Sequence, residues 1–185
     1  MIDKTEKIVD AAAAMFGRYG YSKTTMGDIA AEAGVSRQTV YNAFPGKEEI
    51  LRAAVRKYGQ TAQHEVVARW ADAADFVEKI DLFHTHVPLK WFELMQASPA
   101  WADLMEGMHI AAAEEVRDID HNWRIVLTEI FTAELRRMMQ GTRPAEDIVD
   151  FFYNASVNAK HGARDLDHLR RRLATIKAAT LGLMA

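Results

Sequence analysis

Residues 25–44, TMGDIAAEAGVSRQTVYNAF, decide the fold of the first part of this chain. The stretch predicts two short helices, over residues 25–33 and 36–43. Ser36 is a favoured N-terminal cap, and Gly34 interrupts the helical pattern. Two short helices that meet at a glycine-containing turn can cross steeply, which is the geometry of a helix-turn-helix. The stretch therefore predicts a motif that exposes one side of its second helix.

The second helix of this motif has one apolar and one polar side. Val35, Val40 and Phe44 are expected to hold it against the helix before it. Its polar side suits the major groove of DNA, where glutamine and asparagine can pair with adenine, and arginine with guanine. Threonine and lysine at neighbouring helix starts can bind phosphates and so set the register on the duplex. The residues expected to contact DNA are Thr25, Ser36, Arg37, Gln38, Thr39, Tyr41, Asn42 and Lys47.

Residues 8–51 resemble the DNA-binding segment of the TetR family of bacterial repressors. The resemblance rests on elements that occur in order in IVDAAAAMFGRYGYSKTTMGDIAAEAGVSRQTVYNAFPGKEEIL. They are an alanine-rich helix ending in Phe-Gly, then Gly-Tyr, Thr-Thr, Asp-Ile-Ala, Ala-Gly-Val-Ser, Thr-Val-Tyr and Phe-Pro-Gly-Lys-Glu-Glu. The resemblance implies an all-helical fold, a homodimer, an operator with two half-sites, and release of the operator by a ligand.

Transferred by position, the resemblance divides the expected DNA contacts into two groups. The base-reading positions are Gln38, Thr39 and Asn42. The positions that contact the DNA backbone are Thr25, Arg37, Tyr41 and Lys47. Many members of the family carry glycine at the position of Gln38, so the operator of a relative does not transfer to this chain.

The rest of the chain also predicts helices, since no alternating apolar and polar run of strand length stands out. Proline and glycine mark the breaks, and a kink is expected at Pro88. The fold class is therefore all-α, with about nine helices. We expect a DNA-binding domain over residues 1–46 and a helical effector-binding and dimerisation domain over residues 47–185. The first helix is expected over about residues 5–17, and those after residue 46 over 47–71, 75–97, 101–108, 111–140, 145–160 and 166–183.

The last two helices carry apolar stripes that predict a dimer interface. In residues 166–183 the stripe alternates spacings of three and four, as in a coiled-coil seam. Two such helices from each subunit can form a symmetric four-helix bundle. The same stripes could instead complete the core of a single subunit. The side chains expected at the dimer interface are Val149, Phe152, Tyr153, Ser156, Leu169, Leu173, Ile176 and Thr180.

The middle of the chain is rich in tryptophan, methionine and histidine. Such side chains suit a flexible apolar cavity with few polar groups, but they serve equally well as core packing. The expected effector is a small, largely apolar molecule. The residues expected to line its pocket are His86, Trp91, Met95, Trp101, Met105, His109 and Trp123.

Composition excludes several classes of protein and site. The chain has no cysteine, which rules out disulfides, thiolate metal sites and cysteine nucleophiles. No motif of a phosphate-binding loop, zinc protease or serine hydrolase is present, so we expect no enzyme, cofactor or metal site. No apolar stretch has the length of a membrane span or the pattern of an export signal, so a cytoplasmic location is expected.

The charge is distributed unevenly along the chain. Residues 1–58 hold nine basic and seven acidic side chains, whereas the whole chain has a net charge of −3. This mild asymmetry favours an anionic partner for the N-terminal part.

Two alternatives to a ligand-released repressor stay open on the residues alone. The chain could bind DNA constitutively, with the methionine and tryptophan residues serving only as core. It could also be a helical ligand-binding or interaction module without functional DNA binding.

Overall fold

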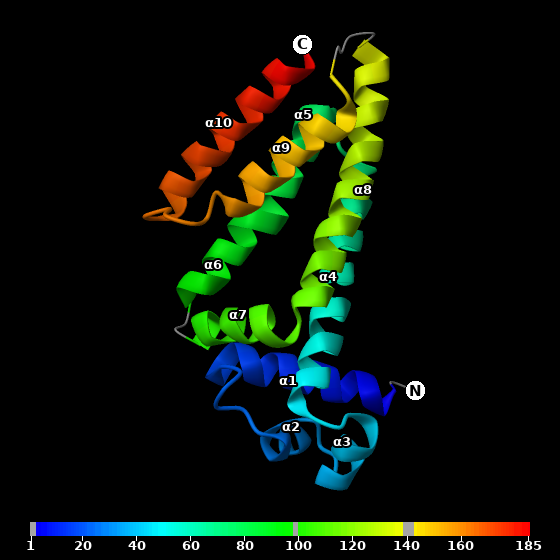
Figure 1. Ribbon diagram of the computed structural model, residues 1–185, viewed down its shortest axis with the longest axis vertical. Coiled ribbons are helices and arrows are strands. Elements are labelled where there is room, and N and C mark those ends of the chain that lie inside the picture. The colour runs from blue at the N-terminus through cyan, green and yellow to red at the C-terminus, as the bar shows by residue number, and fades with distance from the viewer. Residues whose placement is uncertain (1–2, 98–99, 139–142) are drawn as a thin grey trace. The chain divides into compact units, whose positions relative to one another are not determined.

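The computed structural model describes residues 3–97, 100–138 and 143–185, and all regular structure within them is helical (Figure 1). None of the helices in this part of the chain is long and apolar enough to cross a membrane. The helices are α1 (Lys4–Tyr19), α2 (Met26–Glu32), α3 (Arg37–Ala43), α4 (Lys47–Trp70), α5 (Phe76–His84), η1 (Thr85–Leu89), α6 (Lys90–Ala97), α7 (Ala100–Ala111), α8 (Ala113–Met138), α9 (Ala145–Asn158) and α10 (Leu166–Met184).

The expected helices are confirmed, with ends that differ by about three residues at most. The expected end of the long helix at residue 140 lies outside the described residues. The cap predicted at Ser36 is also confirmed. Thr25 and Ser36 cap α2 and α3, and aspartates cap α1, α5 and α10. Each cap satisfies a backbone N–H that has no partner within its helix.

The kink expected at Pro88 takes the form of a change in helix type. Residues Thr85–Leu89 form the π-helix η1, which joins α5 to α6 without a break. A proline has no N–H, and its ring collides with the carbonyl four residues earlier in an α-helix. The wider i→i+5 turn of a π-helix leaves room for this ring. Counted as one segment, α5, η1 and α6 bring the helices of the described chain to the expected nine.

The structure divides into two compact units. The first comprises Met1–Thr61 and Leu94–Ile119, and the second comprises Ala62–Glu93 and Asp120–Ala185. The first unit is larger than residues 1–46, because the first half of α4 and helix α7 pack with the three N-terminal helices. The functional boundary at residue 46 stays a prediction.

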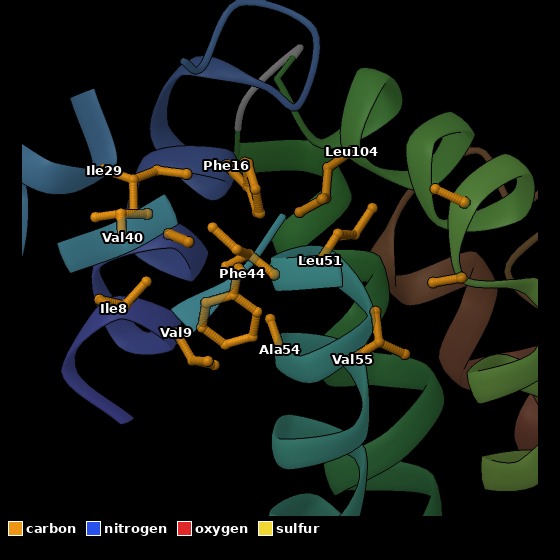
Figure 2. Packing of buried hydrophobic residues seen from close by; sticks show 14 of the residues in the cluster. Ile8, Val9, Phe16, Ile29, Val40, Phe44, Leu51, Ala54, Val55 and Leu104 are labelled. Carbon is orange, nitrogen blue, oxygen red and sulfur yellow. The ribbon is translucent and has the colours of Figure 1, made fainter. Parts of the chain in front are cut away.

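The core of the first unit gathers apolar side chains from α1, α2, α3, α4 and α7 (Figure 2). Phe16 of α1, Leu51 of α4 and Leu104 of α7 all belong to this cluster. Burial of each large side chain stabilises the unit by about 1.5–3 kcal/mol. The residues labelled in Figure 2 are Ile8, Val9, Phe16, Ile29, Val40, Phe44, Leu51, Ala54, Val55 and Leu104.

Polar contacts hold α4 on two sides within the first unit. Arg52 donates from Nε to the carbonyl of Ala111 over 2.7 Å, and Arg56 pairs with the buried carboxylate of Glu115. From another side of α4, the Lys57 ammonium lies 2.7 Å from the Asp10 carboxylate of α1. The first half of α4 is therefore tied both to α1 and to the junction of α7 with α8.

The core of the second unit is built from aromatic rings. Phe83 lies edge-on to Trp123, with 5.1 Å between ring centroids, and 5.3 Å from Phe152. Phe131 lies 5.4 Å from Phe152 and packs edge-on against Phe76 at 4.9 Å. Edge-to-face packing of this kind adds to the free energy gained by burial alone.

A buried histidine joins two helices of this aromatic core. His84 of α5 shares a 3.0 Å hydrogen bond between its Nε2 and the Ser156 Oγ of α9, and its ring stacks on Phe152. Burial lowers the pKa of His84 from 6.5 to about 4, because the charged imidazolium cannot be solvated there. The ring is therefore neutral at physiological pH.

The side chains expected at the dimer seam lie mostly inside the second unit, which corrects that expectation. Phe152, Ser156, Leu169 and Thr180 are fully buried within a single chain. Val149, Tyr153 and Leu173 are also buried, and Ile176 is half-buried against the same core. A side chain that is covered by its own subunit cannot be covered by a second copy. These stripes therefore complete the core of one subunit, as the alternative interpretation of the sequence predicts.

Candidate nucleic-acid interface

The helix-turn-helix is fixed by its buried side. The Val35 N–H donates to the carbonyl of Ala30 over 3.0 Å, and Gly34 has a φ of 65°, a conformation that glycine adopts without strain. Val40 on α3 is fully buried, and Phe44, which ends that helix, is buried beside it. The side of α3 opposite Val40 therefore faces away from the core.

The exposed side of α3 carries the polar residues that the sequence predicts to read DNA. Arg37, Gln38, Tyr41 and Asn42 are all exposed, and Tyr41 keeps 53% of its surface accessible. Gln38 donates from Nε2 to Asn42 Oδ1 over 2.7 Å, because residues four apart are neighbours on a helix surface. The two amides thus form one hydrogen-bonded pair on this face.

Ser36 and Thr39 are engaged with each other at the start of α3. The Thr39 N–H donates to Ser36 Oγ over 3.1 Å, and the two hydroxyl oxygens lie 2.8 Å apart. Ser36 therefore serves as the helix cap. The Thr39 hydroxyl is directed to Ser36. The methyl group of Thr39 is available for apolar contact, and a thymine methyl in the major groove is a suitable partner.

Thr25 caps the start of α2, and Arg37 of α3 lies over the first turn of the same helix. Thr25 and Asp28 form a capping box, in which Thr25 N–H donates to Asp28 Oδ2 over 2.9 Å and Asp28 N–H donates to Thr25 Oγ1 over 3.2 Å. The Thr25 hydroxyl also donates to Asp28 Oδ2 over 2.7 Å. This bond and the one from the Thr25 N–H lower the pKa of Asp28, with a smaller contribution from the charge of Arg37. The Arg37 guanidinium passes over Gly27, where a Cβ atom would lie 2.7 Å from Nη2.

Lys47 starts α4, and its ammonium is bound by the turn that precedes α2. Its Nζ donates to the carbonyls of Tyr21, Ser22 and Thr24 at 2.9, 3.3 and 3.3 Å. It also lies 4.4 Å from the centroid of the Tyr21 ring. An ammonium has three N–H donors, so three carbonyls account for all of them. The contact of Lys47 with a phosphate stays a prediction, and it requires at least one of these bonds to break.

Helix α7 holds the same turn from another direction. Ser22 donates to the Asp103 carboxylate from its backbone N–H, over 2.8 Å, and from its hydroxyl. These bonds lower the pKa of Asp103. The Tyr21 ring lies against Gly107, where a Cβ atom would come within 2.7 Å of the ring. The turn is thus fixed by one cation of α4 and one carboxylate of α7.

Sequence reasoning did not identify Asp103 as part of this region. It lies 81 positions from Ser22, and no local pattern connects the two. Gly107 was the available signal, since a glycine inside a helical pattern often marks a close approach by another group. The pattern could not have named Tyr21 as that group.

The residues expected to line an effector pocket do not fall in one unit. His86, Trp91 and Trp123 belong to the second unit, and the other four belong to the first. Trp123 is buried between Trp70 and Phe83. His86 is half-buried, and this burial, together with Arg69 and Lys90, lowers its pKa.

The four members of the set in the first unit differ in their surroundings. Trp101 packs against the core of the helix-turn-helix unit, Met95 and Met105 are half-buried, and His109 is exposed. The pocket therefore stays a prediction. Within residues 3–97, 100–138 and 143–185, no three histidine, aspartate or glutamate side chains gather as a metal ion requires.

Comparison with known proteins places the N-terminal part in a family. The model of the family described as bacterial regulatory proteins, tetR family, matches residues 8–54. The chain is also similar to the HTH-type transcriptional regulator YxaF of Bacillus subtilis (strain 168), with 35% identity over 82 residues. That alignment spans 44% of this chain and 43% of YxaF, so it covers less than half the length of this relative.

Solved structures match over nearly the whole chain. A TetR transcription regulator from Haloarcula marismortui ATCC 43049 has a TM-score of 0.79 at 18% identity, covering 98% of both chains. The SmeT–triclosan complex has a TM-score of 0.65 at 20% identity, covering 97% of this chain and 90% of SmeT. At these identities the likeness concerns the fold. Residues 8–54 thus match the DNA-binding segment of the TetR family of bacterial regulatory proteins, and the whole chain shares the all-helical fold of the solved TetR structures.

Proposed function

We propose that this chain is a sequence-specific DNA-binding transcription regulator, a repressor that leaves its operator when a small, largely apolar molecule binds. The exposed polar face of α3 is the observation that carries the proposal. That helix is fixed on its other side by Val40 and Phe44, so its polar face is presented rigidly. A helix of this kind fits the major groove, and the face offers the donors and acceptors that base edges require.

The proposal gives each exposed residue a role. Gln38 and Thr39 contact base edges, with Asn42 beside them. Thr25, Arg37 and Tyr41 contact phosphates, and Ser36 orders the start of α3. Phosphate contacts set the register on the duplex, while base contacts supply the specificity.

We place the contact between two copies of the chain on the exposed faces of α9 and α10, outside the buried stripes. The positions classed as exposed in the second half of α10 carry short side chains, and short side chains let two helices approach closely. A two-fold axis makes such a contact isologous, and it sets two α3 helices in major grooves about 34–36 Å apart. The exposed small residues of α10 are Ala174, Thr175, Ala178, Ala179 and Gly182.

Release follows from how the turn before α2 is held. We assign effector binding to residues 47–185 and DNA binding to residues 1–46. Lys47 of α4 and Asp103 of α7 both hold the turn over residues 21–24, so a shift of either helix moves the helix-turn-helix. Such a shift changes the separation of the two α3 helices in a dimer. Effector and operator then weaken each other's binding by the same factor.

The experiment that tests DNA recognition is selection from a randomised duplex library, followed by sequencing. We expect an enriched palindrome when the selection is run near physiological salt, because affinity for DNA depends strongly on salt. Arg37→Ala should weaken binding to the selected duplex by about ten- to a hundredfold, as loss of one charge-assisted hydrogen bond does. Arg137→Ala is the matched control, since Arg137 is exposed on α8 and pairs with its helix neighbour Glu134, and it should bind as the wild type does.

The outcome that overturns the proposal is the absence of any enriched sequence from a folded dimer. That result would favour the interaction module without DNA binding. The effector is sought by thermal-shift screening with three classes of compound: hydrophobic aromatics, fatty acids and quaternary ammonium ions. A compound that stabilises the protein must also lower its operator affinity if it is the effector.

A further inference from the structure

We propose that Gln38 reads one adenine in each operator half-site and that Asn42 acts by holding the Gln38 amide, not as a second independent reader of bases. This inference rests on the proposed function, since it concerns how the same face of α3 discriminates sequence. It assigns to two neighbouring amides different roles, one in contact with the base and one in positioning.

The observation behind this assignment is the direction of the bond between the two amides. Gln38 Nε2 is the donor and Asn42 Oδ1 is the acceptor, over 2.7 Å. Both side chains are exposed on α3, and they lie one helical turn apart. The bond fixes which way each amide group faces, because reversal of either amide would bring two donors or two acceptors together.

The groups left over after this bond determine what the pair can read. Gln38 keeps its carbonyl oxygen and one N–H of its amide. When the N–H on the Cγ side is the one that bonds Asn42, the oxygen and the remaining N–H lie side by side. Adenine presents an acceptor, N7, next to a donor, the N6 amino group, in the major groove. The free edge of Gln38 therefore matches adenine with two hydrogen bonds, while its other N–H stays on Asn42.

Asn42 is less suited to read adenine by itself in this arrangement. A bidentate contact from Asn42 needs its oxygen and an N–H directed together at the base. That oxygen already accepts a bond from Gln38 along the helix, so only its second lone pair is left for a base. Its N–H groups remain free to donate to a single acceptor. A fixed amide also loses less side-chain entropy when it binds, which is the benefit that Asn42 supplies to Gln38.

A double-mutant cycle in the library selection tests this division. Wild type should enrich an A·T pair at one position of each half-site, with a preference of about five- to a hundred-fold over the other pairs. Gln38→Ala should abolish the preference at that position alone. Asn42→Ala should lower the preference at the same position, and it should change nothing further there in the Gln38→Ala background, because its effect acts through Gln38.

Asn42→Asp is the conservative control. It keeps an oxygen that accepts from Gln38 Nε2, so the adenine preference should persist even though the added negative charge weakens binding to all sequences. The inference is overturned if Asn42→Ala changes the preference at a different base position and leaves that of Gln38 intact, or if the position lost in Gln38→Ala is not adenine. A wild type that enriches no sequence overturns the proposed function itself, and with it this inference.

Discussion

Replacement of Lys47 by methionine separates two roles that this residue can have. Methionine keeps most of the aliphatic stem and removes the ammonium, so the apolar contacts of the side chain change little. In the structure the ammonium binds three carbonyls of the turn before α2 and lies over the Tyr21 ring. We therefore expect Lys47→Met to act first on the stability of this turn.

The expected loss of stability follows from the geometry. The bond to Tyr21 at 2.9 Å has the usual length, whereas those to Ser22 and Thr24 at 3.3 Å are long. A good hydrogen bond to a charged group contributes about 1.5–3 kcal/mol. The long bonds contribute less, and the side chain is only half-buried, so solvent screens part of the effect. We expect a total near 2 kcal/mol, which lowers the melting temperature of a chain of this size by about 4–8 °C.

The assay combines a melting curve with the salt dependence of operator binding. If Lys47 only holds the turn, Lys47→Met should lower the affinity at every salt concentration and leave the slope of log K against log salt unchanged. If Lys47 neutralises a phosphate, Lys47→Met should reduce the magnitude of that slope by about 0.9. Lys23→Met is the matched control, because it removes the same charge from an exposed position in the same turn. An unchanged melting temperature for Lys47→Met with a slope reduced by about 0.9 would refute the reasoning.

Two further predictions concern the second unit. The neutral, buried His84 should make the protein less stable as the pH falls: between about pH 6.5 and 4 the unfolded chain takes up a proton that the folded chain excludes. The loss is about 2 kcal/mol from pH 7.5 to pH 5, and His84→Gln, which can still bond Ser156, should remove it in denaturant titrations at the two pH values. Phe152→Leu should cost about 1–2 kcal/mol in unfolding experiments, without raising the dissociation constant of the dimer. Ala178→Glu should instead raise the dissociation constant of the dimer and leave the stability of the subunit nearly unchanged, so that sedimentation velocity finds a folded monomer. An equal effect of both variants on dissociation would contradict our placement of the dimer contact.

The parts of the fold that sequence could predict are those set by neighbours along the chain. The caps at Thr25 and Ser36 each satisfy a backbone group three residues away, so the residues themselves carry the information. The same holds for the exposed face of α3, because helical periodicity alone separates it from the buried Val40.

The parts that sequence could not predict depend on what covers a given surface. The apolar stripes of α9 and α10 correctly indicated burial, but periodicity does not say whether the cover is the same chain or a second copy. Phe152 illustrates this, since it is covered by Phe83 and Phe131 of its own chain. Lys47 is a second case in which the partner could not be predicted. Its position at a helix start predicted an anion as the partner of its ammonium. In the structure the ammonium binds carbonyls of a turn 23 to 26 positions away in the sequence.

The π-helical turn at Thr85–Leu89 has a consequence for aligning this region with relatives. A π turn holds one residue more than the α turn it replaces, so the buried stripe of α5, which includes Ile80 and Phe83, continues into α6 one position later than α-helical counting expects. Phe92 is buried accordingly. An ungapped alignment with a relative whose helix is α throughout would match interior positions of one protein with surface positions of the other after Leu89. A single-residue gap placed within η1 restores the correspondence, and residues of α6 should be compared with those of relatives only after that gap is made.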